Sequence, residues 1–212
     1  MRNLALAAVA AAFLAVPSTG AAQLQLAGRF GYSIAAGDFA RQTPVPRSID
    51  GYVPVQLDLT YRLGQGLSVG AFASYGIANL AASMVSACET TGTSCGGRQL
   101  RAGLQVMWTL EQVSPVFAPW FALAGGGDWL MLRWEEDGSF TKDRWSGLAG
   151  SLTFGVDIKG RNPTFGPYLS VGLGRYDRYR RDLDGQVYSA DIAGDRRLHR
   201  DFSIGLRGAF EL

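Results

Sequence analysis

A run of strict alternation between apolar and polar residues, from Val53 to Leu63, constrains the fold of this chain more than any other feature. The residue types alternate in this order: Val53, Pro54, Val55, Gln56, Leu57, Asp58, Leu59, Thr60, Tyr61, Arg62 and Leu63. Successive side chains of a β-strand point to opposite faces, so this strand would have one apolar and one polar face. A tilted strand of this length rises about 28 Å, close to the roughly 25 Å apolar band of a membrane barrel. The run therefore predicts a strand that can cross a bilayer.

The same pattern recurs along the chain and predicts eight strands. They are expected at Leu24–Ile34, Val53–Leu63, Leu67–Ile77, Gln99–Leu110, Val116 to about Arg133, Leu148–Ile158, Leu169–Gly174 and Phe202–Leu212. In the fifth strand the glycines Gly125 to Gly127 could hold a bulge that resets the alternation, so its two faces stay unassigned. The glycines of Gly125–Gly127 and of Gly172–Gly174 lack a dinucleotide fingerprint and its helix, so they are interpreted as packing positions of the barrel.

The connections between these strands alternate in length. Long ones are expected at 35–51, 78–98, 133–145 and 180–197, and short ones at 64–66, 111–115 and 159–164. Four long connections would then share one end of the fold and three tight turns the other, with both termini at the turn end. This asymmetry is typical of an all-β, up-and-down antiparallel transmembrane barrel, with short periplasmic turns and longer extracellular loops.

The N-terminal residues 1–22 have the pattern of a cleaved secretory signal peptide. Arg2 precedes an apolar stretch from Leu4 to Val16, and small residues follow up to Ala22. Residues 23–212 would then form one barrel domain in the outer membrane. Without Arg2 the chain has 19 basic and 18 acidic residues, which argues against a nucleic-acid partner. No later apolar run is long enough for a transmembrane helix.

Alternation alone does not decide which face is outside, because a soluble periplasmic lipocalin-like ligand binder also alternates. Charge placement favours the membrane. More than half of the charged residues lie in 133–144 and 175–201, and the chain has only two lysines. A solvated strand face is usually dense in Lys and Glu, whereas this polar face is mostly Gly, Ser, Thr and Gln. Aromatic residues near strand ends suit the bilayer interface: Tyr61, Tyr75, Trp108, Trp120, Trp134 and Tyr168.

With these features the chain resembles the small eight-stranded outer-membrane barrels of Gram-negative bacteria, the OmpA/OmpX-like group, which includes lipid A-modifying enzymes. The last strand, Phe202–Leu212, is similar to the signal read by the barrel-assembly machinery, although this family usually ends in an aromatic residue. The resemblance implies export to the outer membrane, the assembly machinery as a partner during biogenesis, and a monomer. It leaves the subfamily open.

The interior of an eight-stranded barrel is only wide enough for side chains, so charges on the polar faces should meet there. This lumenal set comprises Arg29, Asp58, Arg62, Arg101, Asp157, Arg207 and Glu211. Paired, these groups would plug the lumen as a structural network, and a proton or ion path is the alternative. An open porin is disfavoured by the size of the barrel.

Cys88 and Cys95 are the two cysteines, and they lie in one stretch rich in Ser, Thr and Gly. In an exported protein they favour a disulfide. A metal site is not expected, because the only histidine, His199, is distant in sequence. No cofactor is expected either.

Two groups of residues are candidates for function. His199, Asp201 and Ser203 occupy alternate positions of the last strand and so share a face, which suggests a nucleophile and a base. The arginines Arg175, Arg178, Arg180 and Arg181 lie where the seventh strand leaves the membrane, at the level of lipopolysaccharide phosphates. The alternative for the arginines is a solvated loop balanced by Asp177, Asp182 and Asp184.

These patterns favour a structural or surface-interaction role for the barrel, in envelope integrity, adhesion or lipopolysaccharide contact through long extracellular loops. A lipid A-modifying enzyme is the second hypothesis, and the lipocalin-like binder is the third.

Overall fold

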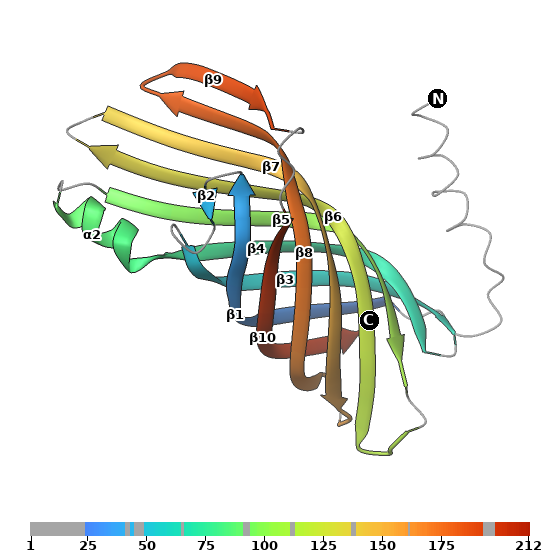
Figure 1. Ribbon diagram of the computed structural model, residues 1–212. Coiled ribbons are helices and arrows are strands. Elements are labelled where there is room, and N and C mark those ends of the chain that lie inside the picture. Colours follow the sequence, from blue (N-terminus) through green and yellow to red (C-terminus); the bar gives the residue numbers. More distant parts are fainter. Residues whose placement is uncertain are drawn as a thin grey trace, which may run out of the picture.

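The computed structural model describes residues 24–40, 43–44, 49–64, 66–90, 94–110, 113–136, 139–160, 162–192 and 198–212, so the predicted signal peptide lies outside the described residues. Eight long antiparallel strands close into a barrel (Figure 1). They are β1 (Leu24–Ala40), β3 (Ile49–Gly64), β4 (Leu67–Leu80), β5 (Ser94–Thr109), β6 (Phe117–Glu136), β7 (Ser139–Ile158), β8 (Thr164–Leu183) and β10 (Leu198–Glu211). Each pairs with the next, and β10 pairs with both β8 and β1. The predicted fold class is confirmed.

The apolar faces of the strands lie on the outside of the barrel. Leu57, Leu104 and Ile204 are each about 60% exposed, whereas Asp58 and Thr60, from the alternate positions of the same strand as Leu57, are buried inside. The lipocalin-like hypothesis required the apolar faces to line the interior, and this arrangement is the reverse. No helix among the described residues is long and apolar enough to cross a membrane.

The bulge expected in the fifth strand is absent, and that hypothesis is wrong. β6 pairs with β5 and β7 in continuous register across Gly125–Gly127. A Cβ on Gly126 would collide with the backbone of Gly103 on β5, so glycine here permits a close approach of two strands. The register assigns the faces: Leu123 and Trp129 point outward, and Leu130 lies inside.

Most of the predicted long connections are strands, which corrects that expectation. β1 reaches Ala40 and pairs with the short β2 (Thr43–Pro44), while β8 pairs beyond the barrel with β9 (Gln186–Asp191). The second predicted long connection, 78–98, contains the helix α2 (Ala82–Thr90). These segments are rich in charges and do not alternate, yet strand pairing satisfies their backbone hydrogen bonds outside the barrel. The end that carries α2 and β9 is called the loop end, and the opposite end the turn end.

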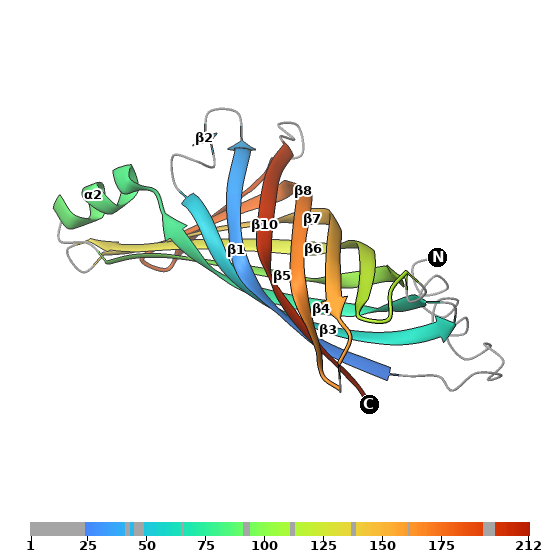
Figure 2. The same ribbon diagram turned by 90° about the horizontal axis from the view of Figure 1, so that it is seen from below.

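At the loop end β5 to β9 continue to one side as a projecting sheet, formed by residues 94–99, 130–136, 139–146, 176–183 and 186–191 (Figures 1 and 2). β8 changes partner on the way: residues up to Arg175 pair with β10, and residues from Arg178 pair with β9. The register of β8 against β7 also shifts by one residue at Asp177. This β-bulge resets the alternation, so that Arg178 and Arg180 point outward.

The prediction that aromatic residues near strand ends lie at the bilayer interface requires their rings to face outward, and only some of them do. Tyr75 and Trp108 are outward and exposed. Trp120 and Tyr168 are buried in the lumen, where they pack with Met107 and Ala122. Trp134 also lies on the inner face, beside Arg181. The prediction was wrong for these three rings because nearness to a strand end says nothing about which face carries the ring.

Candidate functional site: the barrel lumen and an outward arginine groove

A cluster of charges fills the middle of the lumen around Arg101 of β5. The Arg101 guanidinium donates from Nη1 and Nη2 to the carboxylate of Asp201 at 3.1 and 2.8 Å, and from Nε to Asp128 Oδ2 at 3.2 Å. Gln99 Nε2 adds a hydrogen bond to Asp128 Oδ1 at 3.0 Å. Both acids are buried and share one guanidinium, so the stability of the cluster depends on Arg101.

His199 belongs to the same cluster. Its Nε2 is 3.2 Å from Asp128 Oδ2, and its ring stacks on Tyr176 with 4.5 Å between centroids. A Cβ on Gly174 would collide with the imidazole, and one on Gly172 with the Asp201 carboxylate. These two glycines of β8 therefore make room for the cluster.

The predicted catalytic residues share the lumenal face, but the structure does not link them to one another. His199 contacts Asp128, Asp201 contacts Arg101, and Ser203 donates to Ser33 Oγ at 3.0 Å. A nucleophile needs its base within hydrogen-bond reach, and here each of the three groups is bonded to a different residue. The arrangement favours a structural network.

A second layer of charge pairs lies nearer the turn end. Arg29 Nε is 2.7 Å from Asp58 Oδ2, and Arg207 pairs with Asp157. Both guanidinium groups lie over the Trp120 ring, at 5.3 and 5.0 Å from its centroid. Arg62 and Glu211 pair at 2.8 Å at the mouth, where both are partly exposed. Six of the seven predicted lumenal charges thus lie in pairs, whereas Arg101 pairs with two acids outside the predicted set.

Apolar side chains close the lumen above the charges, at the loop end. This apolar cap comprises Ala35, Ile49, Tyr52, Ala78, Leu130, Leu132, Trp145 and Tyr176. Between the two charge layers a polar cavity of about 60 Å³ remains, enough for a few water molecules. The described part of the lumen is therefore filled in three layers, and it resembles a protein core more than a channel.

The inner face of the projecting sheet carries a separate ion pair. Arg181 binds Asp143 through two hydrogen bonds of 2.7 Å, and the Tyr179 hydroxyl donates to Asp143 Oδ1 at 2.8 Å. Burial and the Asp143 carboxylate raise the pKa of Tyr179, so the phenol stays a neutral donor. Arg181, one of the four arginines predicted to contact lipopolysaccharide, is thus directed inward and held by an acid.

The other three arginines of that set point outward and differ in their partners. Arg175 Nε lies 3.4 Å from Oδ1 of Asp177, which is the residue at the β-bulge. Arg178 and Arg180 lie farther out on β8, in the projecting sheet. The bulge at Asp177 is the reason that these neighbours and Arg181 face different sides.

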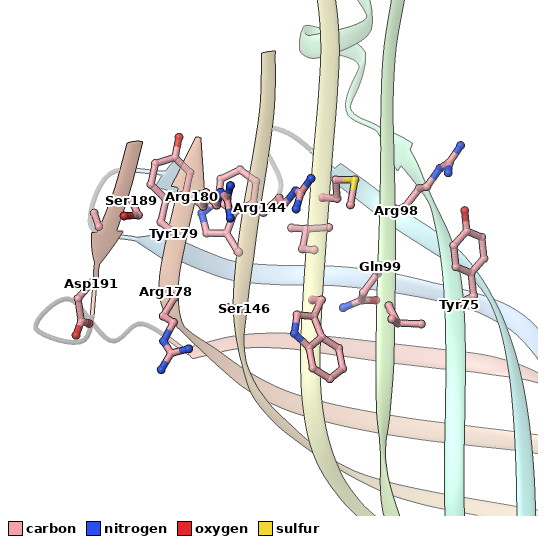
Figure 3. A pocket seen from close by; sticks show the side chains of 16 residues that line it. Tyr75, Arg98, Gln99, Arg144, Ser146, Arg178, Tyr179, Arg180, Ser189 and Asp191 are labelled. Carbon is pink, nitrogen blue, oxygen red and sulfur yellow. The ribbon is translucent and has the colours of Figure 1, made fainter. Parts of the chain in front are cut away.

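Arg178 and Arg180 line a groove of about 720 Å³ on the outer face of β4 to β9, here called the arginine groove (Figure 3). Two rows of residues in register across the strands form it. The upper row is Arg98, Met131, Arg144, Arg180 and Ser189, and the lower row is Tyr75, Leu100, Trp129, Ser146, Arg178 and Asp191. Along the strands Arg98 lies above Leu100, Arg144 above Ser146 and Arg180 above Arg178. The lower row is apolar and aromatic on β4 to β6, where it continues into the apolar belt of the barrel.

Sequence reasoning missed several residues of these sites, among them Asp128, Asp143 and Arg98. Asp128 follows the three glycines of β6, and its role depends on a parity that the sequence left unassigned. Arg98 was placed in a loop, whereas it lies on β5 and in the upper row of the groove. If the alternation had been assumed to run unbroken through β6, it would have predicted that Asp128 lies on the polar, lumenal face.

The sequence matches no protein-family model and no curated protein. Solved structures are similar in fold. A major outer membrane protein from Thermus thermophilus has a TM-score of 0.67 at 11% identity, over 91% of this chain and 100% of that chain. The chain has the fold of the small eight-stranded outer-membrane β-barrels. OprG from Pseudomonas aeruginosa has a TM-score of 0.46 at 16% identity, over 90% of this chain and 96% of that chain.

Together with its apolar outer face, this fold supports a location of the barrel in the outer membrane. The small size of such barrels also explains why their lumen is packed with side chains.

The predicted disulfide of the barrel is confirmed: Cys88 of α2 is bonded to Cys95 of β5. Replacing both cysteines by Ser should free this short loop, whose closure contributes about 2–3 kcal/mol to local order. We expect faster limited proteolysis between α2 and β5, with the heat-dependent electrophoretic shift of the barrel unchanged. Loss of that shift would mean that the disulfide is needed for the barrel itself.

Proposed function

We propose that this chain is a monomeric outer-membrane protein with a structural or surface-interaction role, exported by a cleaved signal peptide and inserted by the barrel-assembly machinery. In this proposal the loop end is extracellular and the barrel contacts lipopolysaccharide at its rim. The observation that carries the proposal is the division of the described residues into a filled lumen and an outer surface that bears an apolar belt and a groove lined by arginines. In this proposal the outer surface, rather than the lumen, makes the contacts with other molecules.

A filled lumen predicts that the barrel does not conduct ions. Purified barrel added to a planar lipid bilayer is expected to give no stepwise conductance, because the Arg101 cluster and the apolar cap leave no continuous path through the described part of the lumen. A known porin in the same bilayer is the positive control. Reproducible single-channel steps from the barrel would overturn the proposal.

The lipid A-modifying hypothesis has its own test. Lipid A from cells with and without this protein is compared by mass spectrometry, and we expect identical acyl and phosphate content. A change in mass that disappears in a Ser203→Ala or His199→Gln variant of normal heat-dependent migration would identify an enzyme instead.

A further inference from the structure

The strongest unexplained feature of the outer surface is a pair of like charges at directly opposite positions. Arg144 of β7 lies opposite Arg180 of β8 in the upper row of the arginine groove. Like charges at opposed positions of an antiparallel pair are destabilising. Within the described residues neither side chain forms an ion pair. The fold therefore places two arginines at opposed positions on the outside, and no described acid is paired with either.

Further basic residues surround this pair. Arg98 lies in the same row, on the other side of Met131, and Lys142 lies on β7 two residues from Arg144. Burial and the neighbouring Arg144, Arg133 and Arg98 lower the pKa of Lys142, although Asp182 opposes them. Among the described side chains of this face, basic residues thus outnumber the acidic residues Asp182 and Asp191. Asp191, which lies opposite Arg178 in the lower row, is an acidic residue of the groove.

The part of the lower row on β4 to β6 has the opposite character. Tyr75, Leu100 and Trp129 are outward and nearly half exposed. The Trp129 ring covers Gly127, whose Cβ position it fills, so the indole lies flat along the strand toward the barrel belt. An occupant of the groove would meet guanidinium groups on β7 and β8, and apolar and aromatic side chains on β4 to β6.

We propose that the arginine groove is a binding site for one phosphorylated glycolipid of the outer leaflet, of the lipid A type. Arg144 and Arg180 take a phosphate between them, with Arg98 beside it, because a planar guanidinium fork matches two phosphate oxygens. An acyl chain of the same lipid lies over Trp129 and Leu100 and continues down the apolar belt. The phosphate also removes the repulsion between Arg144 and Arg180. This inference rests on the proposed location of the barrel and names one site within its rim.

The test is a titration of the purified, refolded barrel in detergent with bisphosphoryl lipid A, followed by tryptophan fluorescence, with native mass spectrometry for the number of bound lipids. We expect saturable binding of one lipid. The double variant Arg144→Gln/Arg180→Gln should bind at least tenfold more weakly, since two charge-assisted contacts are lost. The matched control is Arg200→Gln, an exposed outward arginine of β10 that lies outside the groove. It should change the affinity less than twofold.

Several outcomes would overturn the proposal. Equal weakening by the control and the double variant would indicate diffuse charge attraction, as would binding of many lipids without saturation. A phosphorylated disaccharide without acyl chains that binds as tightly as lipid A would identify a soluble anion instead. If the double variant leaves saturable lipid A binding intact, the groove is not the site, while the wider proposal of rim contact survives. Heat-dependent migration of each variant confirms that it is folded.

Discussion

An Arg101→Gln variant is expected to lose about 3–5 kcal/mol of unfolding free energy, the range for breaking a buried ion pair by removing one partner. Asp128 and Asp201 would keep their buried carboxylates without the guanidinium that both of them contact. The loss is read from urea unfolding of the barrel in lipid vesicles, followed by tryptophan fluorescence. The band that migrates as folded barrel without boiling should weaken in parallel.

The control for this experiment is Arg62→Gln, which breaks a partly exposed pair with Glu211 at the turn end. Exposed pairs contribute about 0–1 kcal/mol, so this variant should unfold almost like the parent chain. Adding Asp128→Asn and Asp201→Asn to Arg101→Gln should restore part of the loss, because the uncompensated carboxylates are gone. Equal effects of Arg101→Gln and Arg62→Gln would show that the central cluster is not the buried core of the lumen.

The second large effect is expected at the lipid face. Leu104 lies midway between Leu100 and Trp108 on β5 and is 59% exposed. Leu104→Arg should destabilise the barrel in lipid vesicles by about 2–4 kcal/mol, because the charge would lie near the bilayer midplane. Leu63→Arg, at the turn end of β3, should cost only about 0–1 kcal/mol near the interface. A barrel with a solvated outer face would tolerate both, so similar small losses would contradict the membrane orientation.

The fold could be predicted because its signal is local and repeated. Val55, Leu57 and Leu59 share one face and Gln56 and Asp58 the other, as their spacing alone requires of any strand. Charge placement then predicted that the apolar face lies outside. The ends of the strands could not be predicted in the same way. Residues of the projecting sheet such as Arg144 and Arg180 have an extended backbone because their strands pair, although their sequence does not alternate. A sequence pattern based on alternation therefore places them in loops.

The candidate sites depended more heavily on tertiary structure. Arg29 and Asp58 were predicted together because both lie on the polar faces of clearly alternating strands. Asp128 was missed because three glycines obscured the parity of its strand, and the pairing of Arg101 with it is visible only in the closed barrel. Arg181 and Arg180 are neighbours in sequence, but they lie on opposite faces of the sheet, with Arg181 held by Asp143.

The sequence by itself determined the eight strands, the antiparallel barrel, the disulfide and the apolar character of one face, since each follows from local alternation, turn spacing or cysteine content. Only the tertiary structure decided which lumenal charges pair and which arginines of the described strands face outward, away from the lumenal acids. Pairing depends on strand register and closure, and a single extra residue at Asp177 shifts the register and reverses the side on which every later side chain of β8 lies.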